Sequence, residues 1–360
     1  MKYLRITFLA AVLLAALSCT GCARKNEIMS GANCFIVNQY GPASFDARFK
    51  GNSQNEITGI ESAEVLWESF GNDVKPSVGD VVSNVKVRKG IVSFVASGKD
   101  GNAVIAVKDF EGKILWSWHI WVCEGFDPLA TAHVYYNDAG VVMDRNLGAI
   151  SAQKGDVKAH GLMYQWGRKD PFLSGKLLQC DGEMAESTIS WPSPVASDQS
   201  NGTIDFAIQN PTTFITSNDL NLDWLYTGDK TGEHSRWNTE KTMYDPCPKG
   251  WKVPEGGENG LWCKALGSTT VLTDTAPWDE TNRGMDFSGL FSDAAEVWYT
   301  TSGYRPNGNG IVSVVGGSGT CWSCTQREMG ACDLIFYPDF VNPNYGGYHP
   351  AGRAVRCVQE

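Results

Sequence analysis

The chain has 360 residues, which is the length of two or three ordinary domains. Hydrophobic residues make up 42% and charged residues 19%, a composition typical of a globular protein, and the 39 Gly, 15 Pro and 13 Trp favour a loop-rich, mainly β body. The net charge of −10, without any basic run, would repel a phosphate backbone, so we expect no nucleic-acid partner.

The first residues have the pattern of an export signal. Lys2 and Arg5 precede an apolar run, 6–17, which is too short to span a bilayer but is typical of a signal-peptide core. The stretch SCTGC that follows resembles a bacterial lipobox, in which a cysteine is lipidated and becomes the new N-terminus. We predict lipidation at Cys19, which follows apolar and small residues, or failing that at Cys22.

Residues 1–22 are therefore predicted to be a lipoprotein signal peptide with its lipobox, and residues 23–31 a short polar tether. Double acylation anchors a protein stably, so we expect an outer-membrane lipoprotein exposed at the cell surface. The alternative is an ordinary secretory signal with incidental cysteines. Export in either form leads to an oxidising compartment, so the 11 cysteines are candidates for disulfides.

Residues 32–126 contain short strand patterns separated by turn signals, which favours an immunoglobulin-like β-sandwich. The predicted strands are 34–37, 65–67, 81–87, 91–97, 103–109 and 114–123. The last of them alternates and places apolar residues on one face: Trp116, Trp118, Ile120 and Val122. Cys34 lies in the first strand and Cys123 in the last, so we expect a disulfide between them if those strands are neighbours.

A proline-containing stretch, 124–130, marks the boundary to a second domain, 127–360. Helix patterns there are few and short. One covers 205–210 and stops before a proline, and another covers 261–267 and stops at a glycine. The remainder is predicted to be short strands and long loops, and no internal repeat is present.

An ordered set of motifs runs through residues 130–360. In chain order the motifs are VMDRNLGA (142–149), GLMYQWGRKDPF (161–172), DFAIQNPTTFI (205–215), DWLY (223–226), RW (236–237), KTMYDPCPKGWKVP (241–254), SGYRPNGNG (302–310), a WS pair (322–323) and GRAVRCVQE (352–360). This set resembles the Fibrobacter succinogenes major paralogous domain, found in many lipoproteins of Bacteroidetes, and the preceding part resembles the β-domain often placed before it. The resemblance implies a loop-rich α+β domain that is C-type-lectin-like, as in formylglycine-generating enzymes. We therefore predict a chain that is mainly β overall, with an immunoglobulin-like β-sandwich followed by a C-type-lectin-like α+β domain.

The resemblance also implies an interpretation of the punctuated stretch YDPCPKGWKVPEGG, 244–257. In the related folds such a segment leads into a helix, and a terminal strand ending in Arg-Cys returns beside it. This implies a disulfide between Cys247 and Cys357. Trp251 then fills the core of a corner whose prolines fix φ. The glycine-rich run that follows departs from the family's pattern, so we expect the helix to begin late.

Metal and cofactor chemistry finds little support in the sequence. The five His have no metal-ligand spacing, so we expect no metal and no cofactor. Cys321 and Cys324 form a C-x-x-C without a second such pair, which favours a local or cross-loop disulfide over a zinc or redox site. Formylglycine-generating enzymes hold copper with a cysteine pair just before the terminal arginine motif, and 346–356 contains no cysteine. That activity is therefore not expected.

Charged residues inside the motifs are interpreted as structural. Arg145 and Arg168 are predicted to be buried partners of carboxylates such as Asp170, rather than parts of a ligand groove. Three aspartates are interpreted as a solvated acidic loop rather than a hydrolase pair: Asp219, Asp223 and Asp229.

The function we expect is that of a non-catalytic, lipid-anchored envelope protein with adhesin-like binding of a glycan or a surface protein. The alternatives are a structural subunit of a surface assembly and an enzyme, a hydrolase or oxidase, on the same scaffold. Late loops form the variable binding face of lectin-like folds, and here they are rich in Gly, Asn and Tyr. The candidate ligand-binding residues are Tyr304, Asn307, Asn309, Tyr345 and Tyr348.

Overall fold

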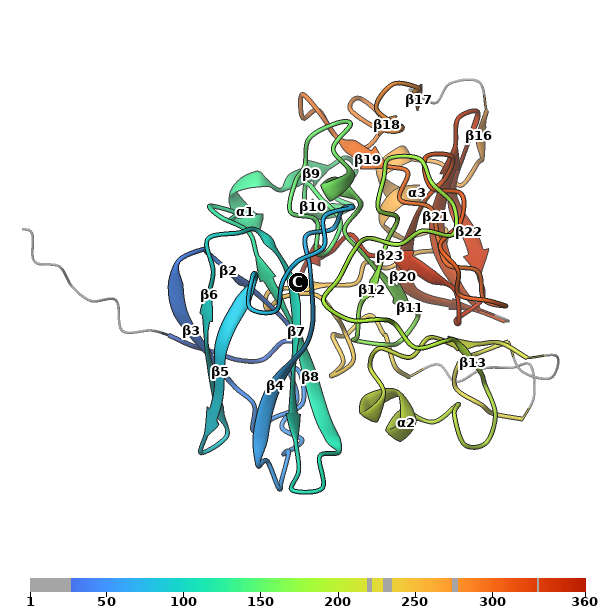
Figure 1. Cartoon of the computed structure of the whole chain (residues 1–360). Coiled ribbons are helices and arrows are strands. Elements are labelled where there is room, and N and C mark those ends of the chain that lie inside the picture. The colour runs from blue at the N-terminus through green and yellow to red at the C-terminus, as the bar shows by residue number, and fades with distance from the viewer. Residues whose placement is uncertain (1–26, 219–221, 229–234, 274–277, 329) are drawn as a thin grey trace, which may run out of the picture.

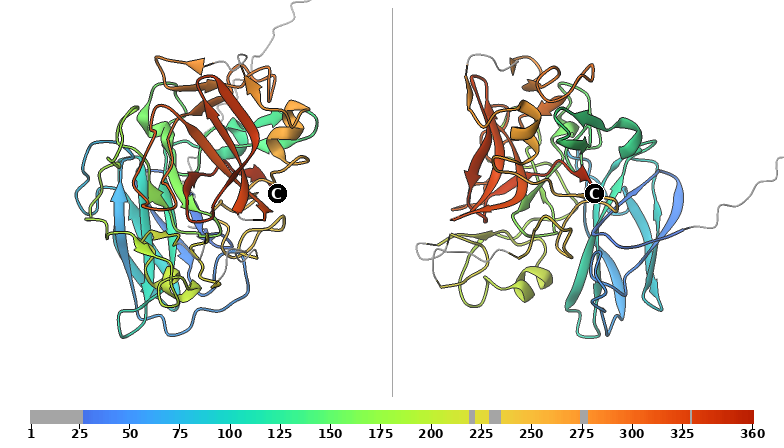
Figure 2. Two further views of the ribbon diagram at one scale, coloured as in Figure 1. Left: turned by 90° about the vertical axis from the view of Figure 1, so that its right-hand side faces the viewer. Right: turned by 180° about the vertical axis from the view of Figure 1, so that it is seen from behind.

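The computed structural model describes residues 27–218, 222–228, 235–273, 278–328 and 330–360 (Figure 1). Both expected lipidation sites, Cys19 and Cys22, lie outside the described residues. The described chain is mainly β, with three short α-helices, and it has two halves that pack side by side (Figure 1). Figure 2 shows from behind that the C-terminal end of the chain lies between these halves.

The first half consists of two four-stranded sheets that face each other around one hydrophobic core (Figure 1). One sheet has the order β1 (Ile28–Met29), β3 (Gly41–Asp46), β6 (Ile91–Ala96) and β5 (Val82–Arg88). The other has the order β2 (Cys34–Val37), β8 (Ile114–Val122), β7 (Gly101–Lys108) and β4 (Ser62–Ser69). All six predicted strands are present. The strands β1 and β3 were not predicted, and β1 lies within the segment 23–31 that was expected to be a tether.

Strand β8 is buried on both faces. Its predicted apolar face, which includes Trp116 and Trp118, packs into the core between the two sheets. The opposite face carries Ser117, His119 and Trp121, which are also buried, because the second half of the molecule covers this face. Alternate side chains of β8 therefore pack against two different buried surfaces, and neither face of the strand meets solvent.

The expected disulfide between Cys34 and Cys123 is wrong, since both thiols are free. Strands β2 and β8 are indeed neighbours, but they run parallel, and Cys34 pairs with His119. Cys123 therefore lies four positions further along the same direction, roughly 13 Å away at the usual rise of a strand. A disulfide needs Cα atoms within about 7 Å.

The second half contains a seven-stranded sheet and three smaller ones. The large sheet has the order β12 (Phe172–Leu173), β11 (Leu162–Gln165), β23 (Gly352–Ala354), β20 (Gly319–Arg327), β21 (Gly330–Tyr337), β22 (Phe340–Gly347) and β16 (Leu272–Thr273). The smaller sheets are β15 (Trp251–Lys252), β24 (Val358–Gln359), β10 (Gly140–Val142) and β9 (His133–Tyr135); β17 (Trp278–Asp279), β18 (Gly284–Asp286) and β19 (Trp298–Thr300); and β13 (Val195–Ala196) with β14 (Ile215–Thr216).

The helices of the second half are short, and the two that were predicted are present within a residue of their expected bounds. In chain order the helices are α1 (Pro128–Thr131), η1 (Val157–His160, a 3-10 helix), α2 (Ile204–Gln209) and α3 (Leu261–Leu266). The Thr203 hydroxyl caps α2 by accepting from the Phe206 N–H at 3.0 Å. Helix α3 begins late, as expected, and it ends at Gly267, whose φ of 65° is the left-handed conformation that glycine adopts readily.

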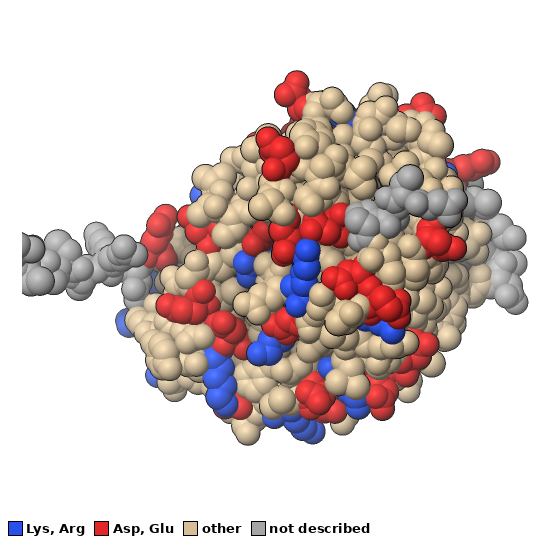
Figure 3. All heavy atoms as spheres, turned by 90° about the horizontal axis from the view of Figure 1, so that it is seen from above, with Lys and Arg blue, Asp and Glu red and all other residues tan. Residues whose placement is uncertain are grey.

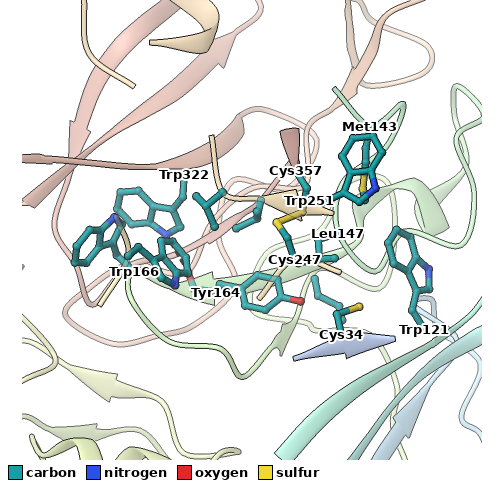
Figure 4. Close-up of a cluster of buried hydrophobic side chains, with 14 of the residues drawn as sticks. Cys34, Trp121, Met143, Leu147, Tyr164, Trp166, Cys247, Trp251, Trp322 and Cys357 are labelled. Carbon is teal, nitrogen blue, oxygen red and sulfur yellow. Dashed lines mark hydrogen bonds between the residues drawn. A yellow bond between two sulfur atoms is a disulfide. The ribbon is translucent and has the colours of Figure 1, made fainter. Parts of the chain in front are cut away.

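The corner 244–257 is stapled to the C-terminus as predicted. Cys247 and Cys357 form a disulfide with Cα atoms 6.1 Å apart, and β15 pairs with β24 beside it. Inside the corner, the Asp245 carboxylate accepts from the N–H groups of Cys247 (2.8 Å) and Val253 (2.9 Å). Trp251 is 5% exposed and belongs to the core, as expected (Figure 4).

One hydrophobic cluster joins the two halves (Figure 4). Cys34 and Trp121 enter it from the first half, whereas Tyr164, Trp166 and Trp251 enter it from the second. The boundary near residue 126 is therefore a change of architecture along the chain and not a gap in the packing.

Polar contacts cross the same interface. The Lys169 ammonium group donates to the backbone oxygen of Ser117 (3.1 Å) and pairs with the Asp170 carboxylate (2.5 Å). The Ser117 hydroxyl donates to Asp170 at 2.6 Å. Asp170 therefore has Lys169 as its ionic partner, and the expected partner Arg168 instead donates to the side-chain oxygen of Gln165 at 2.8 Å. Arg145 does pair with a carboxylate, that of its neighbour Asp144.

The C-x-x-C motif lies in β20, and both of its thiols are free and buried. Cys321 packs into the cluster around α3, whereas Cys324 packs into the cluster that joins the halves. Positions three apart on a strand point to opposite faces of the sheet, so the expected local disulfide is wrong.

The surface seen from above the view of Figure 1 carries a mixture of charges (Figure 3). Acidic side chains gather across the middle of this face, with scattered lysines and arginines between them. This distribution agrees with the net charge of −10.

Candidate functional site

A pocket of about 220 Å³ opens where two loops of the second half meet. One loop, 182–194, contributes Trp191 and two prolines, and the other, 305–312, contributes Arg305 and Ile311. Phe172 and Phe214 complete the wall. We call this site the Arg305 pocket.

The aromatic walls of the pocket are fixed by the sheets behind them. Phe172 begins β12, which pairs with β11, and Phe214 directly precedes β14. The two rings pack edge to face with centroids 5.1 Å apart. Both rings are almost fully buried, so they form a rigid apolar backing for the pocket wall.

Trp191 connects the pocket to the first half of the molecule. Its ring centroid lies 5.6 Å from that of Trp67 in β4 and 6.0 Å from that of Phe172. Its indole N–H donates to the Ser187 hydroxyl at 3.0 Å. The position of this wall therefore depends on both halves of the chain.

The loop 305–312 is held in place by backbone hydrogen bonds at Arg305 and by close packing at Gly310. Arg305 and Gly352 exchange two backbone hydrogen bonds of 2.8 Å each. Gly310 has a φ of 65°, and a Cβ atom there would lie 2.5 Å from the Phe214 ring. Only glycine allows the loop to approach the ring this closely.

Arg305 is the charged residue of the pocket, and it is only 5% exposed. The carbon of its guanidinium group lies 5.6 Å from the ring centroid of Phe172 and 5.4 Å from that of Phe214. One terminal nitrogen contacts the Met184 sulfur at 3.6 Å, which is a weak acceptor. Burial lowers the pKa of Arg305 to about 10, so the side chain stays charged at neutral pH.

No carboxylate in the described part of the chain lies within ion-pair distance of Arg305, and its Nε has no hydrogen-bond partner there. The other buried arginines of the described chain each have an oxygen partner. Arg168 bonds to Gln165, Arg236 pairs with Asp223, Arg353 pairs with Asp333, and Arg356 bonds to Asn146. A buried charge without a partner is energetically costly, so Arg305 is the exception that needs an explanation.

The five residues predicted to bind ligand do not line the Arg305 pocket, although their loop does. The Asn307 side-chain amide donates to the Ser217 hydroxyl at 2.9 Å, and the Asn309 side-chain oxygen accepts from the Ile311 N–H at 2.9 Å. These two side chains therefore shape the loop that carries Ile311 into the wall.

The three tyrosines among those residues lie elsewhere on the late strands and loops. Tyr304 is partly buried under the Arg353 guanidinium group, whose carbon lies 5.7 Å from the ring centroid. Burial raises the pKa of Tyr304. Tyr345 and Tyr348 are 41% and 40% exposed. Sequence reasoning missed Arg305 itself, although it is the one charged residue in the motif SGYRPNGNG.

A second polar cluster is buried elsewhere in the second half of the molecule. Asp223 was expected in a solvated loop, but it is 1% exposed and accepts from His349 Nδ1 at 2.8 Å as well as pairing with Arg236. The His349 ring stacks on Trp166 with centroids 4.3 Å apart. All three side chains are buried and bonded to one another, so we interpret the cluster as structural. The other two aspartates of that prediction, Asp219 and Asp229, lie outside the described residues.

Within the ranges that the structure describes, no group of three or more His, Cys, Asp and Glu side chains is arranged to hold a metal ion. No helix in those ranges is long and apolar enough to span a bilayer.

Comparison of the chain with family models, with curated proteins and with solved structures found no match. The resemblance noted in the motifs therefore remains a prediction, and the pocket has to be interpreted from its own residues.

Proposed function

We propose that this protein is a non-catalytic, lipid-anchored protein of the cell envelope that binds a glycan or a surface protein through the Arg305 pocket. The observation that supports the proposal is the pocket's construction. Three aromatic side chains contribute to a largely apolar concave wall that also holds two hydroxyl residues, Ser193 and Thr212, and one charged residue, Arg305, which is the usual composition of a small-ligand site.

The volume of about 220 Å³ fits one small group rather than a large ligand, because drug-sized sites are roughly 300–1,000 Å³. A terminal sugar or an exposed side chain of a partner protein has this size.

A binding screen tests the proposal. Fragment 23–360, which keeps every described residue and therefore both halves behind Trp191, would be screened against glycans and surface proteins. We expect a ligand whose affinity falls at least about tenfold in Trp191→Ala, as loss of a buried aromatic contact does at binding sites. The matched control is Phe110→Ala, because Phe110 is an aromatic residue that is 83% exposed in the first half.

Alanine substitution at Tyr304, Asn307, Asn309, Tyr345 and Tyr348 would map the surrounding face. A ligand that is insensitive to Trp191→Ala and to all five of these changes would move the site elsewhere. Turnover of a bound ligand would favour the enzyme alternative instead.

A further inference from the structure

We propose that the Arg305 pocket selects its ligand by negative charge, and that it takes a carboxylate carried on a single sugar-sized ring, as in an acidic monosaccharide unit. This inference rests on the proposed function, because it names the class of ligand for the same pocket.

The first argument is the missing partner of the guanidinium group. Arg305 is only 5% exposed, it lines the pocket, and within the described chain no carboxylate compensates its charge. A ligand carboxylate would supply the hydrogen-bond acceptors that the protein does not supply. Arginine is suited to this role since its planar fork of N–H donors matches the two oxygens of a carboxylate.

The second argument is the position of the rings. Phe172 and Phe214 hold the guanidinium group from the inner side at 5.6 Å and 5.4 Å, so its place is fixed before any ligand arrives. Preorganisation of this kind lowers the entropic cost of binding. Trp191 and its adjacent prolines then provide an apolar wall against which the ring of the ligand can pack.

The third argument is the charge balance at the rim. Glu183 follows Gly182 of the pocket wall, and it pairs with Lys176 at 3.1 Å. Because Lys176 and Glu183 neutralise each other, Glu183 is not the counter-ion of Arg305, and Lys176 is not an alternative anion site. Among the described residues that line the pocket itself, Arg305 is the charged one.

The experiment compares glucuronate with its methyl ester, which has the same ring but no charge, by calorimetric titration of the full-length protein in detergent. We expect glucuronate to bind at least about tenfold more tightly than the ester, in line with hydrogen bonds to charged groups. Arg305→Met should abolish this preference, because it removes the charge and the N–H donors but keeps an unbranched apolar stem. Lys249→Met removes an exposed positive charge that does not line the pocket, and it should change the affinity less than about twofold.

Arg305→Lys keeps the charge and serves as the second variant in case Arg305→Met does not fold, which thermal melting would show. We expect lysine to retain a preference for the acid but with weaker affinity, because it lacks the planar fork.

Three results would overturn the inference. Equal binding of acid and ester, lost in Trp191→Ala, would leave the proposed function intact but remove the charge selection. Undiminished binding of glucuronate by both Arg305 variants would place the acid site elsewhere. Absence of binding by either probe up to about 10 mM would also contradict it, whereas failure of the wider glycan and protein screen would contradict the proposed function itself.

Discussion

Arg168 and Arg305 both lie beside the Phe172 ring, at 5.2 Å and 5.6 Å, but their guanidinium groups differ in what they bond. Arg168 donates to the Gln165 side chain and to the Thr213 backbone oxygen at 2.9 Å. Among the residues that the structure describes, the Arg305 guanidinium group donates only to the Met184 thioether, through one terminal nitrogen, besides its contacts with the Phe172 and Phe214 rings. Burial of a charged group is tolerated where its hydrogen bonds are made, so the first residue is structural and the second is available to a ligand.

Trp251→Ala should lower the free energy of unfolding by about 3–5 kcal/mol, because a large buried aromatic side chain leaves a cavity when truncated. Urea unfolding measures this change. Val78→Ala is the control, since Val78 is 83% exposed, and it should unfold like the wild type. A Trp251→Ala protein that also unfolds like the wild type would contradict the assignment of this corner to the core.

Asp223→Asn should destabilise the protein by about 3–5 kcal/mol at pH 7, because it removes a buried carboxylate that pairs with the buried Arg236. Burial alone would raise the pKa of Asp223, but the charges of Arg236 and His349 outweigh it and hold the pKa well below its ordinary value. The stabilisation from Asp223 is therefore present above about pH 4 and is lost as the pH falls further.

Unfolding free energies measured between pH 7 and pH 2 test this dependence. The wild type should lose stability below about pH 4, and the Asp223→Asn protein should show a shallower loss over the same interval. Parallel curves for the two proteins would mean that Asp223 does not carry this contribution.

At the scale of elements, the strands of the first half could be predicted because alternation and turn residues are local signals. The pairing of β2 with β8 could not be predicted, because no feature of either strand's sequence indicates that the two run parallel. That missing direction is why the disulfide between Cys34 and Cys123 was expected and is absent. Cys247 and Cys357 were paired correctly because a motif resemblance supplied the long-range contact.

The candidate site shows the same limit. The loop 302–310 stands out in the sequence by its composition, but its wall residue Trp191 lies more than a hundred positions earlier. The burial of Arg305 depends on Phe172, which lies in β12, and on Phe214, which directly precedes β14. A pattern within one segment does not indicate which distant segments contact it. The tyrosines and asparagines of the loops were therefore favoured as ligand-binding residues over Arg305.

Peptide mapping without reduction tests the disulfide pattern. We expect a link between Cys247 and Cys357, and free thiols at Cys34 and Cys123. Reduction should destabilise the protein by about 4–5 kcal/mol, the chain-entropy value for a loop of this length. A linked peptide pair containing Cys34 and Cys123 would contradict the parallel register of β2 and β8.

At the scale of the whole molecule, the two halves depend on each other. The cluster that contains Trp121 and Trp166 is continuous between them, and Lys169 reaches across to Ser117. Trp191 of the pocket rests on Trp67 of the first half. The first half therefore supports one wall of the Arg305 pocket.

Membrane attachment is predicted to depend on the lipobox cysteines. Replacing both Cys19 and Cys22 by Ser should move the protein from membranes to the soluble fraction, because no acyl chain is then attached. Cys180→Ser, at a partly buried free thiol far along the chain, is the control and should stay with membranes. A double variant that still sediments with membranes after a carbonate wash would contradict the anchor.

Hydrogen exchange of fragment 23–360, with and without the tightest ligand from the screen, tests the central claim most directly. We predict that the ligand slows amide exchange in 182–194 and 305–312, since these two loops form the Arg305 pocket. Strands of the first half remote from Trp67 should exchange unchanged. Protection confined to 32–126, with both pocket loops exchanging as in the free protein, would contradict the account.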